Sequence, residues 1–139
     1  MRRLTYILLF GLMWTQGAHA ETLSLSYDGT FLGRVKATDI ASSLQITINL
    51  DEDLPVSTHV MARFQNNTPY QRLPGGEWQS WSETRSALVD AGFVASDDGT
   101  LTFEIVDEAV SLGFFPVVFT VAYTLENGRL KSGYMVIDQ

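Results

Sequence analysis

An all-β fold is predicted for this chain of 139 residues. Short segments alternate apolar and polar residues with a period of two, turn-forming residues separate these segments, and no long segment has the 3.6-residue apolar period of a helix. Hydrophobic residues make up 45% of the chain and charged residues 18%, a composition that excludes intrinsic disorder. The chain is therefore expected to bury one core.

The first twenty residues are typical of a secretory signal peptide. Arg2 and Arg3 precede an apolar run over residues 4–14, and an Ala-His-Ala sequence at 18–20 matches a cleavage site. The run is too short to cross a bilayer, which takes about 20 apolar residues. We therefore expect a signal peptide at 1–20, a single domain at 21–139 without a membrane span, and a secreted or periplasmic location.

The elements expected in the first half of the domain are strands. Residues 23–27 and 31–36 flank Asp28-Gly29 and predict a first hairpin. Apolar residues alternate with polar ones over 44–50 and again over 60–64, which predicts two half-buried strands. The segments 51–55 and 66–76 are interpreted as connections between strands.

The second half repeats this pattern. Leu101, Phe103 and Ile105 alternate with polar residues after the turn signal Asp97-Asp98-Gly99. Asn127-Gly128 lies between 117–125 and 129–137, and it predicts a hairpin closed by a type I′ turn. Residues 82–91 fit either a helical turn, with Ser80 and Glu83 at capping-box spacing, or a polar crossover. Together the elements predict an immunoglobulin-like or fibronectin-like antiparallel β-sandwich of seven or eight strands.

Three stretches resemble a known kind of domain. These are Val60-Met61-Ala62-Arg63-Phe64, followed by Leu73-Pro74-Gly75-Gly76-Glu77-Trp78-Gln79-Ser80-Trp81, and the closing hairpin 121–128. They resemble a β-sandwich accessory domain that recurs in exported bacterial proteins, in some of them appended to larger surface proteins. The resemblance implies a non-catalytic module, and it implies no catalytic residues.

Charge and cysteine content exclude several functions. Without residues 1–20, the chain carries 7 Lys and Arg against 16 Asp and Glu, a formal charge of −9. This charge disfavours nucleic acid and anionic membranes as partners. The absence of cysteine excludes disulfides, thiolate metal sites and a cysteine nucleophile.

Three aromatic residues are candidates for ligand binding. Trp78 and Trp81, with Tyr70 nearby, could stack on the apolar faces of a sugar. Residues three apart on a regular strand point to opposite faces, so both indoles share one surface only if a turn or bulge separates them. The alternative is that one tryptophan anchors the core and the other covers an edge.

Acidic clusters at 51–53, 97–98 and 107–108 are candidates for a Ca²⁺ site with Asp53, Asp98 and Asp107 as ligands. None of the clusters fits a calcium-loop template, so a solvated acidic surface is the alternative. His59 is the one histidine after residue 20, and it alternates with apolar residues, which predicts a place on the polar face of its strand. No catalytic motif accompanies it, so no enzyme activity and no cofactor are expected.

The function expected from the sequence is contact with a protein partner or with a second copy of the chain, through a sheet edge or an aromatic patch. The final strand at 134–137 is a candidate for that edge, because an edge strand can pair with a partner's strand. The alternative is a small carbohydrate-binding module that uses Tyr70, Trp78 and Trp81.

Overall fold

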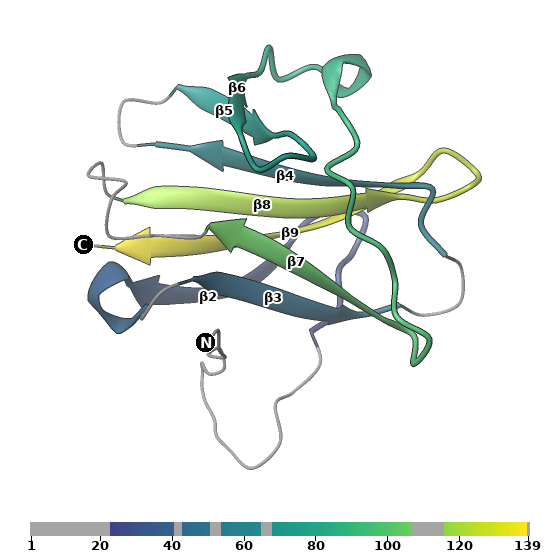
Figure 1. Ribbon diagram of the computed structural model, residues 1–139, viewed down its shortest axis with the longest axis horizontal. Helices are drawn as coiled ribbons and strands as arrows, with labels where there is room; N and C mark the ends of the chain where they lie inside the picture. Colours follow the sequence, from purple (N-terminus) through teal and green to yellow (C-terminus); the bar gives the residue numbers. More distant parts are fainter. Residues whose placement is uncertain (1–22, 41–42, 51–53, 65–67, 107–115, 139) are drawn as a thin grey trace.

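The computed structural model describes residues 23–40, 43–50, 54–64, 68–106 and 116–138. The predicted signal peptide lies outside these residues. In this part of the chain, eight strands form two facing sheets, which confirms the predicted all-β sandwich (Figure 1). The larger sheet has the order β2-β9-β8-β4-β5-β6, and the smaller pairs β3 with β7. The strands are β2 (Thr30–Lys36), β3 (Leu44–Asn49), β4 (Ser57–Arg63), β5 (Pro69–Arg72), β6 (Trp78–Ser80), β7 (Thr100–Val106), β8 (Val117–Thr124) and β9 (Leu130–Asp138).

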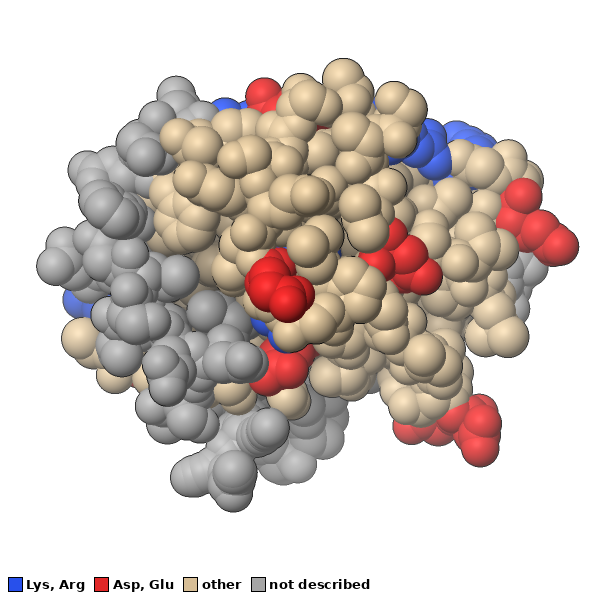
Figure 2. Space-filling view, turned by 45° about the horizontal axis from the view of Figure 1, so that its top comes forward, with Lys and Arg blue, Asp and Glu red and all other residues tan. Residues whose placement is uncertain are grey.

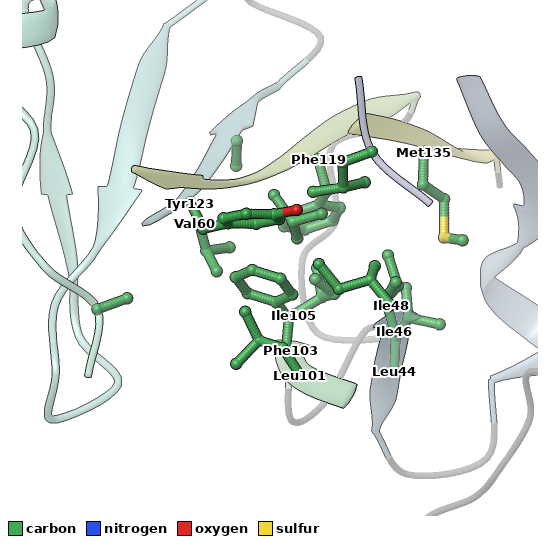
Figure 3. Packing of buried hydrophobic residues seen from close by; sticks show 14 of the residues in the cluster. Leu44, Ile46, Ile48, Val60, Leu101, Phe103, Ile105, Phe119, Tyr123 and Met135 are labelled. Carbon is green, nitrogen blue, oxygen red and sulfur yellow. The ribbon is translucent and has the colours of Figure 1, made fainter. Parts of the chain in front are cut away.

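The core lies between the two sheets. Every second side chain of β3 and β7 points toward the larger sheet. These side chains pack against the inward-facing side chains of β4, β8 and β9. Figure 3 shows the two sets pointing toward each other. The residues that are fully or almost fully buried include Leu44, Ile46, Ile48, Val60, Leu101, Phe103, Ile105, Phe119, Tyr123 and Met135.

Two predictions of strand pairing are wrong. Residues 23–27 and β2 do not pair with each other: Ser26 bridges Ser132, and β2 pairs with the following residues of β9. The β2–β9 pairing is parallel, so the larger sheet is not wholly antiparallel. The predicted connection 66–76 also contains a strand, β5, which extends the larger sheet beyond β4 as in variable-type immunoglobulin domains.

The crossover between β6 and β7 is irregular, as one of the two alternatives for residues 82–91 predicted. Its helical content is a single 3-10 turn, η2 (Arg85–Ala87), and Thr84 rather than Ser80 precedes it. The chain then runs in front of the larger sheet and returns as β7 (Figure 1). Ala91 is buried, and Phe93 and Ala95 pack against the core, so this segment covers what the two-stranded sheet leaves uncovered.

Three connections share one turn geometry. In each, a residue accepts a hydrogen bond from the N–H of a glycine three positions later and donates its own N–H to the carbonyl four positions later. The glycines have φ of 84 to 98°. This is a type I turn followed by a left-handed glycine, and Asn127 does not adopt the positive φ that the predicted type I′ turn requires. The turns are 73–77, 96–100 and 125–129.

Candidate functional site

His59 lies on the outer face of the larger sheet, as alternation predicts, but it is buried at 5% exposure because the crossover covers it. Its Nδ1 lies 3.0 Å from the carbonyl oxygen of Val89, which can only accept, so Nδ1 carries the proton. Nε2 then accepts from the hydroxyls of Ser57, at 3.1 Å, and Thr124, at 3.0 Å. The ring thereby connects β4, β8 and the crossover.

Asp90 forms a second connection one residue away. One carboxylate oxygen accepts hydrogen bonds from the backbone N–H and the hydroxyl of Thr58 and from the N–H of Gly92. The Thr58 hydroxyl oxygen in turn accepts from the N–H of Phe93 at 3.1 Å. The start of β4 therefore supplies partners to the backbone of the crossover.

The protonation of both groups follows from these contacts. Burial lowers the pKa of His59 below its ordinary value of 6.5, against the opposing effects of the Val89 carbonyl and the Asp90 charge. Burial on its own would raise the pKa of Asp90, but the hydrogen bonds from Thr58 and Gly92 outweigh it and lower that pKa. Near neutral pH, a neutral imidazole thus lies beside a charged carboxylate.

The Ser57–His59 pair has the distance of a nucleophile and its base. The group on Nδ1 is a backbone carbonyl, not a carboxylate, since Asp90 directs its hydrogen bonds to Thr58 and Gly92. Nε2 is also shared with Thr124, so Ser57 has no exclusive partner. The arrangement suits a structural cross-link better than nucleophilic catalysis.

The three predicted aromatic ligands do not lie on one surface. Trp78 is directly opposite Arg72, and its ring packs 5.9 Å from that of Phe119 in the core. Tyr70 lies on this same inner face, since it is two residues before Arg72 on β5. Trp81 follows β6, and its indole N–H donates to the Thr84 carbonyl in the next turn. One tryptophan thus contacts the core, in agreement with one of the two sequence-based alternatives.

The predicted calcium ligands fall largely outside the described residues, because Asp53 and Asp107 belong to segments without a described placement. Asp98 lies in the 96–100 turn, where its carboxylate accepts from the N–H and the hydroxyl of Thr100. Its local role is therefore to hold the start of β7.

The final strand is not a sheet edge, and that expectation is wrong. β9 lies between β2 and β8, because β2 pairs in parallel along the side that would otherwise be open. The edges of the larger sheet are β2 and β6. On β2, a register shift between Phe31 and Gly33 interrupts the regular ladder, a feature that opposes pairing with another chain.

An exposed aromatic pair, which the sequence patterns did not single out, lies on the outer face at β2 and β9. Phe31 is 53% exposed and Tyr134 39% exposed, and their ring centroids are 5.4 Å apart. Val136 and Val118, paired on neighbouring strands, are half-buried beside them. The signal available in the sequence was that Tyr134 alternates with the inward-facing residues of β9.

Charges are distributed unevenly around this fold. Figure 2 shows acidic side chains spread over the viewed face, with basic side chains in smaller areas. Arg34 pairs with Asp138 at 2.6 Å, and Arg63 pairs with Glu83. Arg129 stacks on Tyr27, its guanidinium carbon 3.8 Å from the ring centroid. These three basic side chains therefore lie beside acids or an aromatic ring.

Within the described ranges, no helix has the length and apolar character to cross a membrane. The same residues contain no group of three His, Cys, Asp or Glu side chains placed to hold a metal ion. Neither a protein-family model nor a curated protein sequence matches the chain.

Proposed function

We propose that this protein is an exported, non-enzymatic module, secreted or periplasmic, that acts by contact with another protein. The observation that carries the proposal is the exposed pair Phe31–Tyr134 on the outer face of the larger sheet. Aromatic residues are enriched in the centres of protein interfaces, where their large apolar area is removed from water.

The surroundings of the pair support this function. Val118 and Val136 continue the apolar surface across β8 and β9, and the six-stranded sheet supplies a broad backbone platform beneath it. The ion pair Arg34–Asp138 lies at the end of the same two strands. An apolar centre with charged residues at its margin is the usual anatomy of a protein interface.

Site-specific photo-crosslinking in the cell of origin tests the proposal. A photoreactive residue at Val136 is expected to yield a discrete cross-linked product that Tyr134→Ser removes. A photoreactive residue at Glu126, on the exposed tip of the β8–β9 hairpin, serves as the control and is expected to give no such product. A product that persists in Tyr134→Ser, or no product from position 136, would reject the aromatic pair as the contact surface.

A further inference from the structure

Arg72 is a largely buried cation with an ion pair and a cation–π contact but no side-chain hydrogen bond to a described residue. It is 8% exposed, and its Nη2 lies 3.7 Å from Oε1 of Glu104, beyond hydrogen-bond distance. Its guanidinium also lies 5.9 Å from the ring centroid of Phe93. No described residue accepts a hydrogen bond from its side chain, although a guanidinium has five N–H donors. The polar side-chain atom that is enclosed without a partner among the described residues is Ser43 Oγ, so the free donors of Arg72 reach solvent and an incoming acceptor can reach them.

The location of Arg72 is as unusual as its contacts. It lies on the inner face of β5, opposite Trp78, in the part of the larger sheet that extends beyond the two-stranded sheet. Its carboxylate neighbour, Glu104, belongs to β7. The guanidinium therefore lies next to the outer edge of β7, the edge that faces away from β3.

That edge has backbone groups directed away from the sheet. The N–H of Leu50 donates to the Gly99 carbonyl. Because hydrogen-bonded pairs alternate in an antiparallel ladder, Leu101 and Phe103 also direct their backbone groups toward β3. The N–H and carbonyl groups of Thr100 and Thr102 therefore point away from β3. The N–H and carbonyl of Thr100 are taken up by Asp98 and Ser96. Those of Thr102 have no partner among the described residues.

We propose that a separate polypeptide binds here as an extended strand, pairing with the outer edge of β7 at Thr102 and presenting a carboxylate to Arg72. Main-chain hydrogen bonds to the edge would supply affinity, and the charge-assisted bonds to the guanidinium would select acidic segments. Glu104, whose Oε1 lies 3.7 Å from Nη2 of Arg72, would be displaced from Arg72 by the incoming carboxylate.

An extended peptide fits this site better than an acidic glycan. The outward N–H and carbonyl of Thr102 match a strand, whereas the nearest indole, Trp78, packs on Phe119 and offers no flat face for a sugar ring. β8 and β4 separate the site on β5 from the Phe31–Tyr134 pair on β2 and β9 in the sheet order. The site does not depend on the contact proposed for the outer face.

Fluorescence anisotropy with defined peptides tests the proposal. The probes are labelled peptides of about ten residues, a long single strand, that alternate threonine with glutamate or, as the matched control, threonine with glutamine. The glutamate peptide is expected to bind at least roughly tenfold more tightly than the glutamine peptide, because charge-assisted hydrogen bonds are about twice as strong as neutral ones. Arg72→Gln should remove this preference, and Arg63→Gln, a change on the outer face, should leave it intact. Equal binding of both peptides would overturn the role of Arg72.

Two further variants test the strand pairing at Thr102 and the competition for Arg72. Thr102→Pro removes the outward N–H and should abolish peptide binding without unfolding the protein, since proline is tolerated on edge strands. Glu104→Gln removes the internal competitor and should tighten binding, a result that stays decisive even if circular dichroism shows that Arg72→Gln unfolds. An oligogalacturonate that binds in an Arg72-dependent manner while the peptides do not would overturn the strand in favour of a glycan. The absence of binding by every probe would also overturn the site.

Discussion

Two turns of this protein are alike in their hydrogen bonds but lead into different structures. In the turn 125–129, Gly128 donates to the Leu125 carbonyl, and Asn127 Oδ1 accepts from the N–H of Arg129. In the turn 96–100, the corresponding bonds join Gly99 to Ser96 and Thr100 to Asp98. The first turn continues into the ladder of β8 and β9 from Thr124↔Leu130 to Val117↔Ile137. The second has one arm, β7, and no partner strand beside it among the described residues that precede the turn.

The difference arises from the competing partners of residues 91–95. The N–H of Ala91 donates to the Thr58 carbonyl at 2.6 Å, and that of Phe93 donates to the Thr58 hydroxyl. Gly92, with φ of 88°, bends the chain between them. A turn therefore aligns only its nearest residues, and tertiary hydrogen bonds decide whether its arms form a hairpin. The same diversion leaves the N–H and carbonyl of Thr102 without a partner among the described residues, although Ser96 and Phe93 contact β7 at Thr100 and Phe103.

The largest effect is expected from removing one side chain on β9, compared with one on residues 91–95. Met135 on β9 is 2% exposed, and Met135→Ala should lower the free energy of unfolding by about 3 kcal/mol, the usual cost of a buried Met-to-Ala change. Phe93 is half-buried on the diverted arm, so Phe93→Ala should cost about 1 to 2 kcal/mol despite its larger ring. Urea denaturation measures both. An equal or larger loss for Phe93→Ala would show that the diverted arm is as tightly packed as the ladder.

The next effect removes the group that diverts the chain. Thr58→Val retains the shape of a residue that is 1% exposed but leaves the Phe93 N–H without an acceptor, at a cost of about 2 kcal/mol. Hydrogen exchange at the Phe93 amide should accelerate. Thr120→Val, on the outer face of β8, is the control and should stay within about 0.5 kcal/mol of wild type. Unchanged exchange at Phe93 in Thr58→Val would mean that another contact holds the segment.

Local patterns sufficed where the partner of a strand is near in sequence. The β8–β9 hairpin was predicted because two alternating segments flank Asn127-Gly128. The first hairpin was predicted wrongly by the same logic, because β9, more than a hundred residues away, competes for both of its arms. β5 was missed because its inner face carries the charged Arg72, so its residues do not show the apolar and polar alternation expected of a strand that faces the core.

The candidate site was predictable only in part, for a related reason. The spacing of Trp78 and Trp81 left two arrangements open, and in the structure Trp78 belongs to β6 whereas Trp81 follows it. The burial of His59 depends on coverage by Val89, 30 residues later, and no pattern within β4 records that coverage. The exposure of Phe31 and the burial of Arg72 likewise depend on which strands form the two sheets.

A smaller effect tests whether the two turns are energetically alike. A Cβ added at Gly99 or Gly128 would meet no atom within 4 Å, so substitution costs only the left-handed backbone conformation. Gly99→Ala and Gly128→Ala should each lower stability by about 1 kcal/mol, measured by thermal unfolding. Asparagine at either position should cost less, since it tolerates this conformation better. A much larger loss of stability in Gly128→Ala than in Gly99→Ala would show that the β8–β9 ladder amplifies strain at its turn.

The smallest effect is a pH dependence of the diverted region. Because the pKa of His59 in the folded protein lies below 6.5, the unfolded chain binds the proton more readily. Stability should therefore be complete above about pH 6.5 and fall as the pH decreases toward the folded pKa. His59→Gln should remove this slope in urea denaturation. The contribution of Asp90, whose pKa is also lowered, is present above 3.8 and is lost only at still lower pH, so the two groups are separable. If the dependence of stability on pH is unchanged in His59→Gln, another titratable group is responsible for it.

The parallel pairing of β2 with β9 also has a consequence for the order of folding. Lys36 lies opposite Asp138, and Arg34 pairs with Asp138 across 104 residues of sequence. A chain that emerges with its N-terminus first cannot place β2 in the sheet until β9 has been made. Contacts of such separation slow folding, since the closure entropy of the whole chain opposes them. Loss of the nine residues of β9 would thus remove two strands from the sheet rather than one, because β2 would lose its partner.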